Sequence, residues 1–371
     1  MPEFTSLYLD LVRCMAAAAV FLYHAAALGY SIRPHAFTLH GEEAVCIFFV
    51  LSGFVIAHVT DSKENDWRSY TVARLARILP VAVLALLVTS LADKIGILHN
   101  PQLYVHAKFY NADGGVGSWL LALSFGNELW FQHSVVGTNE PFWSLGFEVP
   151  YYLGYGIAIF VPGRLRWVVL AGWAVVVGPK IALYFPMWMM GKLTYRLLHH
   201  NWMRPTLPRL LGSSLLVFSA VNYAILKIAH DTLAPAAMFN WTSLESSIGS
   251  AAYYYGVAIC FGASLLGTFH IFGRSVPVER IGAPVRWLAD GSFTLYLIHL
   301  PLLTAAKAIW PSTAAHPGGS LLIMCGVSLI CYGLASLVER RKAMFRDLFR
   351  KLPLLGLPAA PTQLAPEAQR I

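Results

Sequence analysis

The feature that most constrains this chain is a series of apolar runs, each close to the length that crosses a lipid bilayer. A helix needs about 20 predominantly apolar residues to span the hydrocarbon core. The weakest run, 186–199, is short and contains Lys192 and Arg196. The runs predict an all-α, polytopic integral membrane protein with about ten transmembrane helices, at 8–29, 43–60, 78–93, 142–161, 167–184, 186–199, 209–228, 250–270, 290–310 and 319–338.

Composition supports a membrane domain. Hydrophobic residues make up 57% of the chain and charged residues 12%, whereas soluble domains average about 25% charged residues. No polar linker divides the chain, so we predict one membrane domain at 5–340 and a tail at 341–371 that is basic and then rich in Pro and Ala. We expect the part beyond Leu352 to be disordered. The first apolar run is too long for a signal-peptide core, so no cleavable signal peptide is predicted.

The positions of the basic residues predict the orientation in the membrane. Seventeen Lys and Arg residues fall in the segments that would be cytoplasmic if the N-terminus is inside, against three in the segments on the other side. Basic loops stay on the cytoplasmic side, so both termini are predicted to be cytoplasmic. The apolar stretch 118–131 must then not cross, because a crossing there would place Arg164 and Arg166 outside. Basic residues confined to loops argue against nucleic acid as a partner of this chain, whose net charge is +8.

No metal site, disulfide or permanently bound cofactor is predicted. The five cysteines lie in apolar runs without CxxC spacing and fit small buried side chains. The histidines, including His199 and His200, lack metal-ligand spacing. The chain also lacks a GxSxG elbow, a Walker loop, an HExxH pair and a GxGxxG unit.

The first apolar run carries three ionisable residues that are costly inside a membrane. Asp10 and Arg13 are three residues apart and can pair on one helical face. Arg13 and His24 are eleven residues apart, so they share that face and are separated by about 16 Å along the axis. Burial favours a neutral imidazole, the form that a general base needs. A histidine that is simply packed in the core also fits.

Three arginines precede or enter the third run, which continues through Pro80. Arg74 and Arg77, with Arg68 before them, lie on a predicted helical lead-in to that run. They can fix the topology, bind lipid headgroups, or hold the phosphates of a cytosolic cofactor through their planar guanidinium groups. All three readings fit the sequence.

The fourth run opens with Trp143 and Ser144 and contains Glu148. Ser144 and Glu148 are four residues apart and share a helical side. A carboxylate here can orient an imidazole or share in proton transfer, or it can be paired for structural reasons only. In the second run, the small residues Ser52 and Gly53 predict close helix packing.

The ninth run carries Tyr296 and His299, followed by Pro301, which would kink the helix. His299 falls about mid-span. We favour packing or lining of a pore over catalysis for this residue.

These segments resemble the acyltransferase family 3 membrane proteins. The resemblance rests on LDLVRCMAAAAVFLYHA, GEEAVCIFFVLSGFVIA, RSYTVARLARILP, NEPFWSLGFEVPYYL and FTLYLIHLPLL. They occur in family order and cover roughly residues 5–340. Two features depart from the family pattern: Glu42 and Glu43 stand where a glycine and an aspartate are more common, and Pro150 replaces a polar residue after Glu148.

The resemblance implies an O-acyltransferase that moves an acyl group, most often acetyl, from cytosolic acyl-CoA to a carbohydrate hydroxyl, as on exopolysaccharide or O-antigen. It implies catalytic roles for His24 and Glu148. Some family members carry an appended periplasmic hydrolase-like domain, for which this chain is too short. Binding of acyl-CoA is implied for Arg13, Arg68, Arg74 and Arg77, and supporting roles for Asp10, Trp143, Ser144, Tyr296 and His299.

The expected setting is a bacterial inner (plasma) membrane. The expected partners are acyl-CoA, a carbohydrate or glycolipid acceptor, membrane lipids and proteins of polysaccharide assembly. Two other classes stay open: a transporter or flippase for glycans or lipids, in which ionisable residues line a path, and a non-catalytic scaffold. The absence of internal repeats weakens the transporter reading. Binding or slow hydrolysis of acetyl-CoA would distinguish the enzyme from both.

Overall fold

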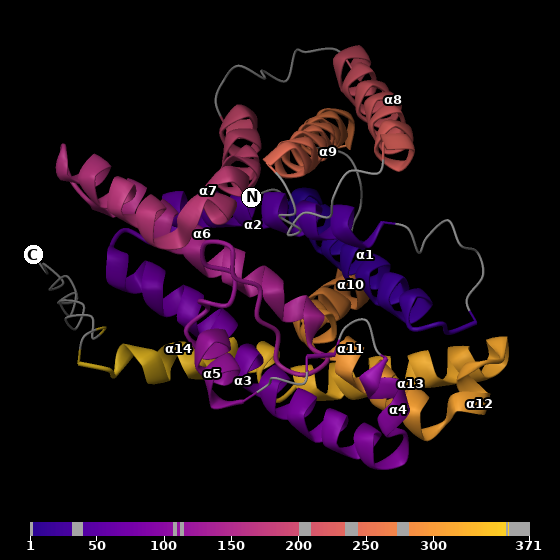
Figure 1. Cartoon of the computed structure of the whole chain (residues 1–371). Helices are drawn as coiled ribbons and strands as arrows, with labels where there is room; N and C mark the ends of the chain where they lie inside the picture. Colours follow the sequence, from indigo (N-terminus) through magenta and orange to yellow (C-terminus); the bar gives the residue numbers. More distant parts are fainter. Residues whose placement is uncertain are drawn as a thin grey trace, which may run out of the picture.

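The computed structural model describes residues 3–31, 40–106, 110–111, 115–199, 209–233, 244–272, 282–353 and 355. The all-α prediction is confirmed: the only strand-like pairing in these ranges is an isolated bridge between Asn111 and Gly137. The predicted disorder beyond Leu352 falls almost wholly outside the described residues. The helices are α1 (Glu3–Ala27), α2 (Gly41–Lys63), α3 (Trp67–His99), α4 (Pro101–Val105), α5 (Val116–Leu123), η2 (Glu140–Ser144), α6 (Leu145–Phe160), α7 (Leu165–His199), α8 (Arg209–Leu233), α9 (Leu244–Phe272), α10 (Gly282–Ala289), α11 (Ser292–Ile309), α12 (Pro311–Ala314), α13 (Pro317–Ala335), η4 (Glu339–Arg341) and α14 (Lys342–Arg350) (Figure 1).

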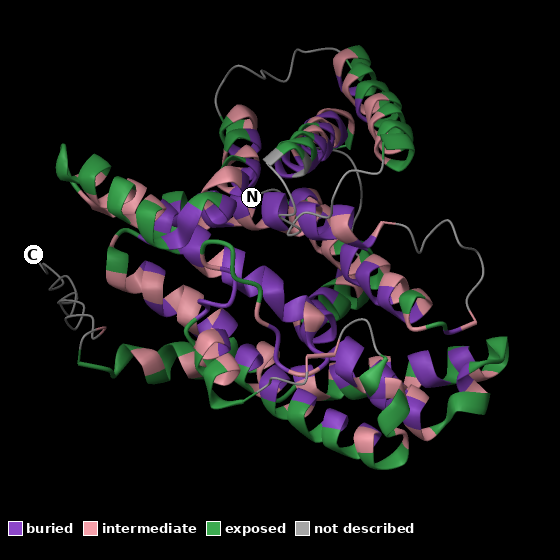
Figure 2. Cartoon of the chain, viewed as in Figure 1, coloured by how far each residue is buried: buried purple, intermediate pink, exposed green. Residues whose placement is uncertain are grey.

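Eight helical stretches within these ranges are long and apolar enough to cross a membrane: α1, α2, α3, α7, α8, α9, α11 and the stretch that begins with α13. Their outer faces carry large apolar side chains. On α8, for example, Val217, Val221 and Ile228 are exposed. Figure 2 shows much of this helix, labelled in Figure 1, in the green of exposed residues. Apolar patches of this extent are rare on soluble proteins. The chain is therefore an integral membrane protein.

The boundary predicted between the runs 167–184 and 186–199 is wrong. The helix continues through Pro186 and breaks instead at Gly178, which has a φ of 82°. Glycine adopts positive φ without steric cost. Gly178 also precedes Pro179, and the α conformation is disfavoured for a residue before a proline. The Gly-Pro pair thus divides α7 into two arms, 165–177 and 179–199, which lie at an angle to each other (Figure 1).

Two of the apolar stretches in the sequence form helices shorter than a membrane span. The run 142–161 begins as the 3-10 turn η2 and continues as α6, which has 16 residues. The stretch 118–131 forms only the eight-residue helix α5, which is about 12 Å long and too short to cross, as predicted. Within the described residues, eight helical stretches are long and apolar enough to cross, and the ten-crossing arrangement stays a prediction.

Contacts with α10 bring the start of α1 close to the segment that follows α13. Arg286 in α10 forms an ion pair with Glu3 at the start of α1, at 3.0 Å. Arg340 in η4 donates to the carbonyl oxygen of Trp287, also in α10, at 3.0 Å. The N-terminus and the segment after α13 therefore meet at α10. The orientation of both termini in the membrane stays a prediction.

Glycines bring α2 and the second arm of α7 into close contact. A Cβ atom on Gly53 would overlap the carbonyl oxygen of Trp188, and a Cβ on Gly191 would overlap that of Val50. The packing role predicted for Gly53 is confirmed. Small residues at such crossings let membrane helices approach closely.

We expect Gly191→Ala to lower the free energy of unfolding by about 1–3 kcal/mol, because an added methyl group cannot fit without moving the α2 backbone. The matched control is Gly172→Ala, in the first arm of the same helix, where a Cβ atom would meet nothing within 4 Å. Thermal unfolding of the two variants in detergent tests this. Equal melting temperatures would show that the contact does not hold the helices together.

Candidate functional site

The centre of the bundle contains a narrow cavity, the central cavity, bounded by α1, α2, α3, α6 and α11. It has a volume of about 50 Å³ and is lined by both apolar and ionisable side chains. The residues on it that the sequence singled out are Arg13, Ser52, Arg77, Ser144, Glu148 and Tyr296. Residues from five segments that are far apart in the sequence therefore meet in one place.

Two arginines from different helices line this cavity. Arg13 on α1 lies 3.6 Å from Asp10, so the predicted pairing is confirmed. Arg77 on α3 has no carboxylate within 4.0 Å among the described residues, and it lines the cavity with Arg13. The planar guanidinium groups of these two arginines match the geometry of phosphate oxygens, and one carboxylate, that of Glu148, lines the same cavity.

Glu148 lies one helical turn after Ser144 on α6 and lines the same cavity. Its Oε1 accepts hydrogen bonds from the hydroxyls of Ser52, at 3.0 Å, and Tyr152. These two residues were missed as site residues. Tyr152 follows Glu148 by four residues, a spacing that places both on one helical side and was readable in the sequence. Ser52 had been assigned to packing together with Gly53.

A histidine pair lies beyond one end of the cavity. His24 Nδ1 on α1 and His299 Nε2 on α11 are 2.9 Å apart. Both side chains are buried, and His299 is fully inaccessible. The sequence placed His299 in a packing or pore-lining role and gave no indication of this pair. His24 thus bonds His299, whereas Glu148 bonds Ser52 and Tyr152.

Aromatic residues form part of the cavity wall. The rings of Phe48 and Tyr296 have centroids 5.5 Å apart, and Tyr296 lies one helical turn before His299. The hydroxyls of Tyr296 and Ser144 both donate to the carbonyl oxygen of Pro141, at 3.2 and 3.0 Å. This contact joins η2 to α11. Trp143 packs edge-on against Phe147, with centroids 5.4 Å apart, and thus supports the site by packing.

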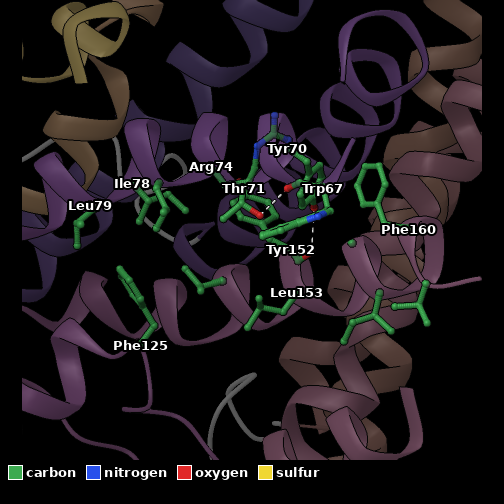
Figure 3. Close-up of a pocket in the computed structure, with 15 residues that line it drawn as sticks. Trp67, Tyr70, Thr71, Arg74, Ile78, Leu79, Phe125, Tyr152, Leu153 and Phe160 are labelled. Carbon is green, nitrogen blue, oxygen red and sulfur yellow. Dashed lines mark hydrogen bonds between the residues drawn. The ribbon is translucent and has the colours of Figure 1, made fainter. Parts of the chain in front are cut away.

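Arg74 and Arg77 line different cavities. Arg74 forms an ion pair with Glu64 at 2.5 Å and lines a second cavity of about 320 Å³, the outer groove, between α3 and α6 (Figure 3). This groove is mainly apolar and includes Leu153 and Phe160. Arg74 also lies over the Tyr152 ring at 5.8 Å, so Tyr152 stands between the two cavities.

Arg68 lies near the start of α3, where Asp66 caps the helix by accepting from the backbone N–H groups of Arg68 and Ser69. Its guanidinium group stacks over the ring of Trp67, at 5.5 Å. Arg68 does not line the central cavity. Of the four arginines grouped by the sequence, the structure brings Arg13 and Arg77 together.

A buried ion cluster that the sequence analysis missed fixes the loop between α5 and η2. Lys180, just after the break in α7, donates to Glu128 Oε2 and to the carbonyl oxygen of Gln132, both at 2.6 Å. Lys180 and Glu128 are at most 1% exposed. His133 Nδ1 lies 2.7 Å from Glu128 and His133 Nε2 lies 3.6 Å from Glu140. The cluster ties the loop that leads into η2, and so positions Ser144.

The charge state of the cluster follows from its geometry. Burial lowers the pKa of His133, but hydrogen bonds to Glu128 and Glu140 and the charges of both carboxylates outweigh it and raise the pKa to about 10. His133 is therefore a cation at neutral pH, so two cations balance two carboxylates. In the parts of the chain that the structure covers, no group of three or more His, Cys, Asp or Glu side chains could hold a metal ion.

Comparison with known proteins gives the same family along nearly the whole chain. The acyltransferase domain of acyltransferase family 3 matches residues 6–338. Acyltransferase MdmB from Streptomyces mycarofaciens is 27% identical over 411 aligned positions, which cover 100% of this chain and 98% of the relative. Peptidoglycan O-acetyltransferase OatA from Listeria monocytogenes serovar 1/2a is 24% identical over 353 positions, covering 87% of this chain and 53% of the relative.

No solved structure matches the chain. The family assignment therefore rests on the sequence comparisons, and it agrees with the all-helical membrane architecture. Because the family match extends from the start of α1 to the end of α13, the chain belongs to acyltransferase family 3 and is a membrane acyltransferase.

Proposed function

We propose that this protein is an O-acyltransferase that moves an acyl group, most often acetyl, from acyl-CoA to a hydroxyl of a carbohydrate. The observation that carries the proposal is the central cavity, which has two arginines on its wall, together with a buried histidine pair one helical turn beyond Tyr296, another of its lining residues. The name of OatA, a peptidoglycan O-acetyltransferase, supports a glycan acceptor. Both relatives come from bacteria, which supports a bacterial plasma membrane as the location.

Donor binding is assigned to Arg13 and Arg77. Their guanidinium groups hold phosphates of acyl-CoA, and the pantetheine arm extends through the central cavity toward His24. Arg13 and His24 are eleven residues apart on one helix, or about 16 Å along its axis, a separation that an extended arm can bridge. At about 50 Å³ the cavity is too small to hold the arm, so side chains such as Phe48 and Tyr296 must move when the donor binds.

His24 then acts as the general base. The acceptor hydroxyl loses its proton to His24 while its oxygen attacks the thioester carbonyl carbon. The C–O bond forms, the C–S bond breaks, and the same proton passes from His24 to the departing sulfur, which leaves as the thiol of CoA. We assign Glu148 to positioning at the donor end of the cavity, because its hydrogen bonds go to Ser52 and Tyr152.

The donor site is tested with the arginines of α3. Arg77→Gln should raise the Kd for acetyl-CoA by about 10- to 100-fold, since hydrogen bonds to charged groups contribute about 1.5–3 kcal/mol and 1.4 kcal/mol is tenfold in affinity. Arg74→Gln is the matched control: it lies three residues away on the same helix and lines the outer groove. Its effect should be smaller than threefold. Binding is measured by calorimetry in lipid nanodiscs.

A second ligand makes the test specific for phosphate. S-acetyl-pantetheine lacks the nucleotide phosphates, so wild type and Arg77→Gln should bind it equally. If Arg74→Gln weakens acetyl-CoA binding as much as Arg77→Gln, the assignment of the central cavity is wrong.

The main alternative, a glycan or lipid transporter or flippase, explains ionisable residues in a membrane equally well. Such a protein, like a scaffold, should neither bind acetyl-CoA nor release its thiol. Mass spectrometry of surface glycans from cells with and without the gene identifies the product: an acetyl group present only with the gene supports the enzyme. Identical glycans, together with no thiol release by the purified protein, would favour the transporter.

A further inference from the structure

The hydrogen-bond partners of the two histidines determine which nitrogen of each ring carries hydrogen. His299 makes two contacts through its ring nitrogens. Its Nδ1 lies 2.9 Å from the carbonyl oxygen of Leu295, and its Nε2 lies 2.9 Å from His24 Nδ1. A carbonyl oxygen only accepts hydrogen bonds, so Nδ1 of His299 must carry hydrogen.

The other nitrogen of His299 must then be an acceptor. A doubly protonated His299 would place a charge on a fully inaccessible side chain, with no carboxylate within 4.0 Å of the ring in the described part of the chain. Its neighbours include the ring of Phe21, with centroids 5.5 Å apart. An isolated charge at such a site is strongly unfavourable. Neutral His299 has its lone pair on Nε2, so it accepts the hydrogen on Nδ1 of His24.

We propose that His299 is a positioning residue that holds His24 in the tautomer with hydrogen on Nδ1, and so makes Nε2 of His24 the basic nitrogen for acyl transfer. This inference rests on the proposed function for its consequence, but not for the tautomer itself. The backbone carbonyl of Leu295 keeps hydrogen on Nδ1 of His299. The lone pair on Nε2 of His299 then keeps hydrogen on Nδ1 of His24. His299 therefore fixes the tautomer of His24. Without His299, the imidazole of His24 would lack this acceptor for the hydrogen on Nδ1.

The pair also stabilises the charged intermediate state of His24. When Nε2 takes the proton of the acceptor hydroxyl, the ring becomes a cation with hydrogen on both nitrogens. Its Nδ1–H stays bonded to the lone pair of His299, and a hydrogen bond from a charged donor is about twice as strong as a neutral one. The proton on Nε2 then goes to the leaving sulfur. No proton is transferred to His299, and the pair returns to its starting state.

The tautomer can be measured without any acyl transfer. Full-length protein labelled with ¹⁵N-histidine in lipid nanodiscs gives ring nitrogen shifts by solid-state NMR, and His24→Ala identifies the signals of His24. We expect His24 to show a protonated Nδ1 and an unprotonated Nε2. Hydrogen on Nε2 of His24 in the neutral ring would overturn the proposal, whether or not the protein transfers acyl groups.

Two variants of His299 then separate positioning from packing. His299→Gln places a side-chain oxygen near the position of Nε2 and keeps an acceptor for His24, whereas His299→Leu fills similar space without one. We expect His299→Leu to lower kcat about 10- to 100-fold with KM for acetyl-CoA unchanged, and His299→Gln to stay within about threefold of wild type. Equal loss in both variants, or no loss in His299→Leu, would contradict the positioning role.

Discussion

His24→Ala is expected to lower kcat for acyl transfer by about 10²- to 10⁴-fold, the range that a positioned general base contributes. The variant should still bind acetyl-CoA with wild-type affinity, because Arg13 lies about three helical turns from His24 on α1, and Arg13 and Arg77 line the central cavity whereas His24 does not. It should also remain folded, since alanine suits a helix interior. Release of the CoA thiol by protein in lipid nanodiscs, and acetyl content of surface glycans in cells, measure the loss.

The matched control is His199→Ala. His199 is an exposed histidine at the end of α7 whose ring packs at a tilt against Tyr195. It does not line the central cavity, so its removal should leave transfer unchanged. Wild-type glycan acetylation by His24→Ala would refute its role as base. Loss of acetyl-CoA binding in His24→Ala would refute the separation of donor site and base.

Lys180→Met should lower the free energy of unfolding by about 3–5 kcal/mol, the range measured when one partner of a buried ion pair is removed. Methionine fills much the same volume, so the loss comes from the carboxylate of Glu128, which is fully inaccessible and loses a cation at 2.6 Å. His133 remains at 2.7 Å and compensates only in part. Denaturation in detergent measures the change.

Lys192→Met is the control on the same arm of α7. The nitrogen of Lys192 lies over the ring of Tyr155 at 4.7 Å, and in the described ranges no carboxylate lies within ion-pair distance. Its replacement should cost less than about 1 kcal/mol. The double variant Lys180→Met with Glu128→Gln should recover part of the stability, since no unpaired carboxylate remains. If Lys180→Met and Lys192→Met unfold alike, the cluster does not stabilise the fold.

The features that could be predicted are those that depend on residues close together in the sequence. Runs of apolar residues predicted the membrane helices, because the length of a run alone decides whether it can cross lipid. The three-residue spacing of Asp10 and Arg13 predicted their contact, because the helical period fixes which neighbours meet. The helical lead-in that carries Arg74 and Arg77 was also predicted correctly, and it is part of α3.

The break in α7 was readable but was misplaced. The predicted boundary fell at residue 185, next to Pro186, which the helix accommodates, whereas the break is at Gly178 before Pro179. A proline preceded by glycine breaks a helix more readily than a proline alone, because glycine can take the positive φ that releases the strain. The hydrogen bond of Ser52, in contrast, could not be predicted from the sequence. Nothing in its local sequence distinguishes packing from a hydrogen bond to Glu148 on another helix.

The sequence by itself thus determined the membrane setting, the helices and the family to which the motifs belong. The tertiary structure alone decided that His24 meets His299, 275 residues away, that Lys180 meets Glu128, and that Arg77 lines the central cavity while Arg74 lines the outer groove. The physical reason is that the helical period fixes neighbours within a helix, whereas the rotation and depth of each helix depend on how all of them pack together.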